Sequence, residues 1–94
     1  MAFFVYLLEC SDKSLYCGYA VDIKARVELH NKGRASKYTK SRLPAKLVFL
    51  EKKKTKSEAL KREAEIKKMA RKEKLELVAS GCVGELQLQP FRKN

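Results

Sequence analysis

The sequence predicts one small α+β domain whose elements follow the order β-β-α-β-α-α. Two short runs of aromatic and β-branched residues near the start are typical of a β-hairpin, and a third apolar run lies in mid-chain. The segments between and after these runs carry helix-start signals and apolar residues at helical spacing. A chain of 94 residues, 45% of them hydrophobic, has material for one modest core. We assign residues 1–79 to this domain and expect residues 80–94 to add a short edge strand or to fray.

The predicted hairpin consists of Phe3–Cys10 and Leu15–Tyr19, joined by a short polar turn. Side chains alternate between the two faces of a strand, so the length of the turn decides which residues become neighbours. A turn of odd length places Tyr6, Tyr16 and Gly18 on one face, whereas a turn of even length separates the two phenols. The sequence leaves both registers open. A glycine within a strand often indicates a point where another backbone or a ligand comes close.

The first predicted helix begins after a cap at Asp22 and ends near Asn31. On a helical wheel, Arg26 and His30 lie one turn apart and project together from the border of the apolar stripe. His30 is therefore either a packing residue, which is the usual role of a lone histidine, or a chemical group at this border.

Residues 33–44 form a polar, basic connection without an apolar period, and we predict a loop. Its tyrosine is flanked by lysine and arginine, a combination that suits base stacking together with phosphate contact. The alternative is a solvated connection in which the tyrosine packs against the domain. The candidate nucleic-acid-binding residues of this segment are Arg34, Lys37, Tyr38, Lys40 and Arg42.

The third strand is predicted over Ala45–Glu51. This run is almost continuously apolar, which indicates a central strand covered on both faces. The sequence Thr55-Lys56-Ser57-Glu58 then matches a capping box and predicts a helix that ends near Ala70. A shorter helix follows and completes the core with Leu75, Leu77 and Val78.

Glu63 is the anomaly of the long predicted helix, because it falls inside the apolar arc rather than opposite it. A carboxylate directed into a core is costly unless it is paired or bound to a cation. We weigh equally an ion pair with Lys67 or Arg26 and a metal site. The apolar arc itself is set by Ala59, Leu60, Ile66 and Ala70.

The chain carries 22 Lys and Arg against 11 Asp and Glu, a formal net charge of +11. Such a field attracts polyanions, and nucleic acid is the first candidate. A membrane surface is the rival, but the most basic helix offers mainly Ala and Leu instead of bulky apolar residues. No run approaches the ~18 apolar residues of a membrane span, and the first run has no basic leader. We expect a cytoplasmic protein without a membrane partner.

The three cysteines, Cys10, Cys17 and Cys82, lack the paired spacing of a zinc knuckle. We expect all of them to be reduced, with Cys10 and Cys17 packed as small apolar strand residues.

Taken in order, Val5-Tyr6, Tyr16-Cys17-Gly18, Arg26 and the glutamate of Glu58–Ala64 resemble the motifs of the GIY-YIG nuclease domain. The match is closest to the small, single-domain bacterial branch of that family and covers roughly Phe3 to Val78. It implies a three-stranded antiparallel sheet flanked by helices, and divalent-metal-dependent cleavage of nucleic-acid phosphodiesters. The first motif reads Phe4-Val5-Tyr6, and the second has cysteine where isoleucine is usual. Both departures fall at packing positions.

Carried over by position, the resemblance gives Tyr6, Tyr16, Arg26 and His30 as catalytic residues and Glu63 as the metal ligand. A single carboxylate can hold Mg²⁺ or Mn²⁺ when water and substrate supply the other oxygens, and an arginine can fork onto the scissile phosphate. A free phenol has a pKa of ~10, so a tyrosine base needs nearby cations. We favour Tyr16 as the base, with His30 as the competing candidate.

The sequence therefore predicts a metal-dependent endonuclease that needs no small-molecule cofactor. DNA is the expected partner before RNA, at branched, damaged or end structures in DNA repair or recombination. One alternative is a nucleic-acid-binding module that cleaves slowly or not at all. Another is an interaction domain whose basic surface docks on an acidic partner, for which the sequence offers no positive sign.

Overall fold

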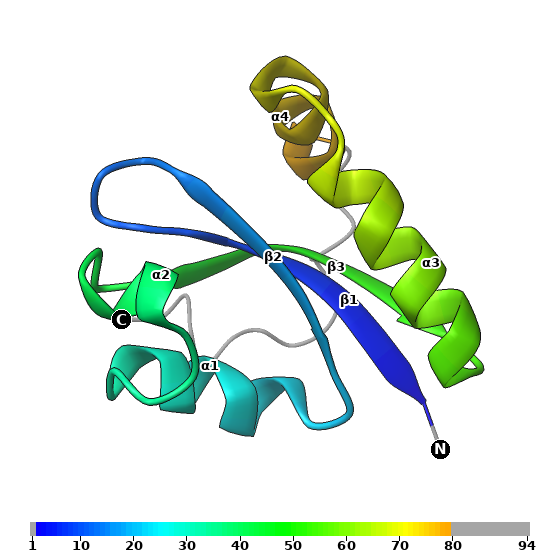
Figure 1. The fold of residues 1–94 in the computed structure, drawn as a ribbon, viewed down its shortest axis with the longest axis horizontal. Coiled ribbons are helices and arrows are strands. Elements are labelled where there is room, and N and C mark those ends of the chain that lie inside the picture. Colours follow the sequence, from blue (N-terminus) through cyan, green and yellow to red (C-terminus); the bar gives the residue numbers. More distant parts are fainter. Residues whose placement is uncertain (1, 80–94) are drawn as a thin grey trace.

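Three strands and four helices make up the described part of the chain in the computed structural model, which covers residues 2–79 (Figure 1). The predicted extension 80–94, with Cys82, lies outside the described residues. The order β-β-α-β-α-α is confirmed, with one addition, the helical turn α2 inside the segment predicted as a loop. The elements are β1 (Phe3–Glu9), β2 (Leu15–Ala20), α1 (Ile23–Asn31), α2 (Lys37–Lys40), β3 (Lys46–Lys53), α3 (Lys56–Lys67) and α4 (Arg71–Ala79).

The strands form an antiparallel sheet in the order β2-β1-β3, with β1 in the centre. Tyr6 lies opposite Gly18, and Leu8 lies opposite Tyr16. Residues 10–14 separate the paired ends of the hairpin, so the turn has the odd length that places both phenols on one face. The register that brings Tyr6 and Tyr16 together is the one observed.

The hairpin turn is fastened to two distant parts of the chain. Lys13 adopts a left-handed backbone conformation, with φ of 71°, and its carbonyl accepts a hydrogen bond of 2.8 Å from Arg71 at the start of α4. Asp12 forms an ion pair of 3.1 Å with Arg42, and the Ser11 N–H donates to the Arg42 carbonyl at 2.8 Å. These contacts hold the end of the hairpin from which the Tyr16 side chain projects.

The prediction of a central position for β3 is wrong, because β3 pairs only with β1 in the described sheet. The continuous apolar run has another cause. Phe49 and Leu50 are both buried, in clusters on opposite faces of the sheet. Phe49 pairs with Leu7, whereas Leu47 pairs with Leu8, so a bulge at Val48 interrupts the alternation. A strand covered on both faces therefore need not lie in the middle of the sheet.

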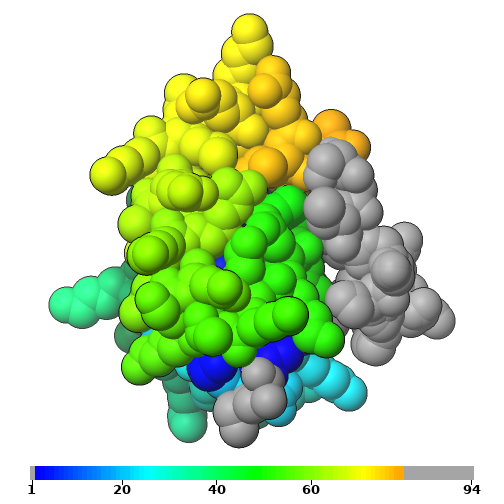
Figure 2. Space-filling view, turned by 90° about the vertical axis from the view of Figure 1, so that its right-hand side faces the viewer, coloured from blue at the N-terminus to red at the C-terminus, as the bar shows by residue number. Residues whose placement is uncertain are grey.

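Helices cover both faces of the sheet (Figure 1). Val27 of α1 packs in the cluster that contains Tyr6, and Ile66 of α3 packs in the opposite cluster with Val5. Figure 2 shows the second side, where α3, α4 and β3 form most of the surface. Both Cys10 and Cys17 are buried free thiols, as predicted.

The capping box of α3 is present, since the Thr55 hydroxyl accepts from the Glu58 N–H at 3.1 Å. The Glu58 carboxylate accepts from the Lys54 N–H at 3.3 Å. The helix ends at Lys67, earlier than the predicted Ala70, and α4 follows after a short break. None of the helices in residues 2–79 has the length and apolar character needed to cross a membrane.

Candidate active site

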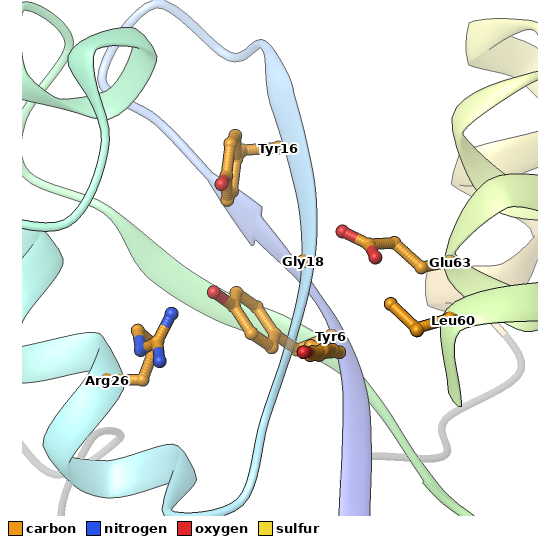
Figure 3. A pocket seen from close by; sticks show the side chains of 7 residues that line it. Tyr6, Tyr16, Gly18, Arg26, Leu60 and Glu63 are labelled. Atoms are coloured by element: carbon orange, nitrogen blue, oxygen red, sulfur yellow. The ribbon is translucent and has the colours of Figure 1, made fainter. Parts of the chain in front are cut away.

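A pocket of about 320 Å³ opens beside β2 and brings together side chains from both faces of the sheet (Figure 3). Tyr6 and Tyr16 reach it from the hairpin, Arg26 from α1, and Glu63 from α3. Four of the five residues predicted as catalytic or metal-binding thus line one pocket. The other lining residues are Gly18, Tyr19 and Leu60.

The Tyr6 ring lies directly over Gly18 of β2. A Cβ atom at this position would lie 2.6 Å from the Tyr6 hydroxyl oxygen and 2.8 Å from Cζ of the same ring. Real Cβ atoms do not approach other atoms so closely, so only glycine fits beneath this ring. The close approach predicted at Gly18 is therefore made by a side chain of the protein itself.

His30 lies behind the two phenols and is fully buried. Its Nε2 is 3.0 Å from the Tyr6 hydroxyl, and its Nδ1 is 2.8 Å from the hydroxyl of Thr39 on α2. The ring centroids of His30 and Tyr16 are 5.1 Å apart, and those of the two phenols are 6.4 Å apart. Both ring nitrogens of His30 are engaged within the protein, so this residue supports the pocket from behind.

Burial sets the protonation states of this aromatic group. It raises the pKa of Tyr6 far above that of a free phenol, with a further contribution from Tyr16, although the charge of Arg26 acts in the opposite direction. Burial lowers the pKa of His30, and the positive charge of Arg26 lowers it further. At neutral pH, Tyr6 keeps its proton and His30 is uncharged.

The lowered pKa of His30 predicts a loss of stability in mild acid. Below the ordinary histidine pKa of ~6.5, the unfolded chain takes up a proton that the buried ring does not. The unfolding free energy should therefore fall as the pH drops through this region, by at most ~1.4 kcal/mol per pH unit from this group. Urea unfolding between pH 7.5 and 5 measures the slope. A His30→Gln variant with the same slope would show that another group causes it.

Glu63 forms the ion pair that the sequence offered as an alternative to a metal site. Its Oε2 lies 3.1 Å from Nζ of Lys67, one turn along α3. The Glu63 side chain is only 18% exposed, whereas that of Lys67 is 54% exposed. The hydrogen bond to Glu63 raises the pKa of Lys67, so the lysine is charged at neutral pH. An exposed partner of this kind can leave the carboxylate at little cost.

The donor set of the pocket suits a hard cation that keeps most of its own water. Within residues 2–79, no three or more His, Cys, Asp and Glu side chains gather to form a metal cage. Glu63 supplies one carboxylate among hydroxyl groups, and Mg²⁺ is commonly held by one or two carboxylates together with water and substrate phosphate. Cys17 is buried on the α3 face of the sheet, and burial together with the Glu63 charge raises its pKa to about 11.

The basic segment lies next to the pocket residue Tyr16, through the ring of Tyr38. Arg34, Lys37 and Lys40 are exposed. The guanidinium of Arg42 lies 4.0 Å above the ring of Tyr38, and the Tyr38 ring is 5.8 Å from that of Tyr16. Tyr38 thus contacts Tyr16 and Arg42 yet stays 38% exposed, while Arg34, Lys37 and Lys40 face solvent.

Comparison with known proteins identifies the family. A model of the GIY-YIG catalytic domain matches residues 2–76. The chain belongs to the GIY-YIG family, which is a family of nucleases. A UPF0213 protein of Staphylococcus aureus is 60% identical over 75 residues, covering 80% of this chain and 92% of that protein.

Two solved structures resemble this GIY-YIG chain. A UPF0213 protein from Bacillus halodurans, solved by solution NMR, has a TM-score of 0.57 at 39% identity and covers 87% of each chain. A protein from E. faecalis, also solved by NMR, has a TM-score of 0.59 at 36% identity and covers 85% of each chain. The names of these proteins specify no reaction.

The departures from the GIY-YIG motifs lie in the core, as expected. Cys17 stands where isoleucine is usual and packs on the α3 face with Val5 and Leu7. Phe4 is half-buried against the opposite cluster. Neither change reaches the hydroxyl groups that line the pocket.

Sequence reasoning missed three residues of this GIY-YIG site. Leu60 was placed in the buried arc of α3, yet it is 43% exposed and lines the pocket. Tyr19 lines the same pocket from β2. Thr39 gave no signal, because its partner His30 lies on another helix. Ser36, an N-cap residue type, was the one sign of α2, and its hydroxyl accepts from the Tyr38 N–H at 3.0 Å.

Proposed function

We propose that this GIY-YIG protein is a divalent-metal-dependent endonuclease that hydrolyses DNA phosphodiester bonds. Branched, damaged or end structures are the proposed substrates, in DNA repair or recombination. The observation that carries the proposal is the convergence of Tyr6, Tyr16, Arg26 and Glu63 on one pocket. Phosphodiester hydrolysis requires a proton acceptor for water and positive charge at the phosphoryl oxygens, and this pocket offers both.

Tyr16 is the proposed proton acceptor, and the contacts of its neighbours favour it over the alternatives. Tyr6 is held in its protonated form by burial and bonds to His30. His30 uses its second nitrogen on Thr39. Tyr16 is half-buried and lines the pocket together with Arg26 and Glu63. It is the residue placed to take a proton from an attacking water.

Arg26 is the proposed phosphate ligand. Its guanidinium is exposed at the mouth of the pocket and presents forked donors that match two phosphoryl oxygens. Glu63 would hold Mg²⁺ or Mn²⁺ once Lys67 releases its carboxylate. The bound cation would supply Lewis-acid charge to the phosphate and help the departing oxygen.

The proposal predicts that Arg26→Ala removes most of the cleavage activity. The lost guanidinium stabilises charge that grows in the transition state, so the rate should fall by roughly 100-fold or more. Branched and linear DNA are incubated with each protein in Mg²⁺ or Mn²⁺, with EDTA as the blank. Lys24→Ala is the matched control, because Lys24 is an exposed cation on the same helix that does not line the pocket. Equal cleavage by wild type and Arg26→Ala would refute the assigned role.

A second candidate function is a nucleic-acid-binding module with little or no catalysis. The ion pair of Glu63 with Lys67 favours it, because the carboxylate of the pocket already has a cationic partner. The net charge of +11 is sufficient for binding that weakens steeply as salt rises. Salt-dependent binding of DNA or RNA by wild type, without product at any concentration of Mg²⁺ or Mn²⁺, would select this function.

A further inference from the structure

We propose that Thr39 is a positioning residue that fixes the tautomer of His30 and thereby the direction of the Tyr6 hydroxyl. Thr39 lies on α2, outside the pocket, and is fully buried. Its effect on cleavage rests on the proposed nuclease function, but its effect on the histidine tautomer does not.

A chain of buried hydrogen bonds leads from α2 to the pocket. The Thr39 hydroxyl is 3.3 Å from the Ser36 carbonyl and 2.8 Å from Nδ1 of His30. On the far side of the ring, Nε2 is 3.0 Å from the Tyr6 hydroxyl. Tyr6, His30 and Thr39 are each no more than 1% exposed, so water cannot replace these partners.

The number of available protons decides which group donates and which accepts in each of these hydrogen bonds. The Ser36 carbonyl only accepts, and Thr39 has one proton to give it. Thr39 must then accept from His30, so the proton of the neutral ring sits on Nδ1. The bare Nε2 accepts from the Tyr6 O–H. In this direction each of the three hydrogen bonds contains one proton, and every buried donor is used.

The reverse direction makes fewer hydrogen bonds. If Thr39 donated to Nδ1, its contact with the Ser36 carbonyl would be lost, and Nε2–H would donate to Tyr6. The Tyr6 proton would then need a new acceptor, and the hydrogen bonds of the described residues include none. The geometry therefore favours a Tyr6 hydroxyl that donates to His30, away from the pocket. Its oxygen then keeps a lone pair for the positive charge of Arg26, which lowers the pKa of Tyr6.

Thr39 also connects this series of hydrogen bonds to the basic segment. Lys37 and Lys40 are exposed on the same helical turn. A nucleic acid bound to these lysines would contact α2, the same helical turn whose Thr39 hydroxyl is hydrogen-bonded to His30.

Ring ¹⁵N NMR of the full chain tests the proposal directly, because the protein contains a single histidine. At pH 7.5 we expect wild type to show a protonated Nδ1 and a bare Nε2. Thr39→Val keeps the shape but removes the acceptor, so the protonated nitrogen should change or become mixed. Thr39→Ser should retain the wild-type tautomer. A protonated Nε2 in wild type would overturn the proposal, even if the valine variant failed to fold. An unchanged tautomer in folded Thr39→Val would overturn it as well.

Cleavage assays provide the second readout. Thr39→Val should lower kcat by about tenfold, the equivalent of one hydrogen bond, with little change in KM. Thr39→Ser should restore most of the rate. An unchanged kcat in Thr39→Val would refute the positioning role in catalysis. If wild type cleaves nothing while the tautomer responds as described, the proposed nuclease function fails and the assignment of Thr39 to His30 stands.

Discussion

Replacing Glu63 by glutamine is expected to abolish metal-dependent cleavage while the fold stays intact. The amide keeps the size of the side chain but removes the negative charge of Glu63, the single carboxylate among the described residues that line the pocket. Loss of the cation would cost the reaction at least ~100-fold in rate. The lost ion pair with Lys67 is largely exposed on the lysine side and contributes ~0.5 kcal/mol or less to stability.

Two measurements make this prediction decisive. DNA cleavage is followed as Mn²⁺ is raised, and Mn²⁺ binding is measured separately from the EPR signal of the free ion. Glu65→Gln is the control, since its side chain lies two residues along the same helix, is 63% exposed and pairs with Arg62. The control should bind Mn²⁺ like wild type. If Glu63→Gln also bound Mn²⁺ like wild type, the cation would not sit on this carboxylate.

Local signals were sufficient to predict most of the fold. The alternating aromatic runs predicted β1 and β2, and the capping box at Thr55 predicted where α3 begins. The position of β3 required more, because burial on both faces depends on how many helices cover the sheet, which no single segment encodes. The bulge at Val48 adds to the difficulty. One extra residue interrupts the alternation of side chains between the two faces of β3, and the sequence does not mark where this happens.

The candidate site was predictable as a set of residues but not as a set of contacts. Glu63 attracted attention because it fell in an apolar arc, and the structure places it half-buried at the pocket. The sequence offered two possible ion-pair partners for Glu63, Lys67 and Arg26, and the structure shows the pair with Lys67. Thr39 could not be found, because nothing in a polar segment tells one threonine from its neighbours until His30 is placed beside it. Contacts between distant segments require the register of all of them.

Gly18→Ala is expected to destabilise the protein and to displace the Tyr6 hydroxyl. In a strand without a steric conflict, alanine in place of glycine stabilises by ~0.4–1 kcal/mol, because the unfolded chain loses freedom. Here the new Cβ would meet the Tyr6 hydroxyl at 2.6 Å and Tyr16 Cε2 at 3.3 Å. The Tyr6 ring is buried and bonded to His30, so relief requires a shift of the core, which costs ~1–3 kcal/mol. Urea unfolding of both proteins measures the difference.

A double-mutant cycle with Tyr6→Leu identifies the cause. The leucine removes both atoms that conflict most closely with the new Cβ, the hydroxyl oxygen and Cζ. If the Tyr6 ring is the obstacle, Gly18→Ala should cost much less in the Tyr6→Leu background, with a coupling of ~1 kcal/mol or more. Additive effects, or an alanine variant as stable as wild type, would mean that the ring does not lie over Gly18. In that event, Gly18 would not be needed to place the Tyr6 and Tyr16 rings on the same face of the sheet. Because a displaced hydroxyl also leaves His30, cleavage by Gly18→Ala should fall further than its loss of stability explains.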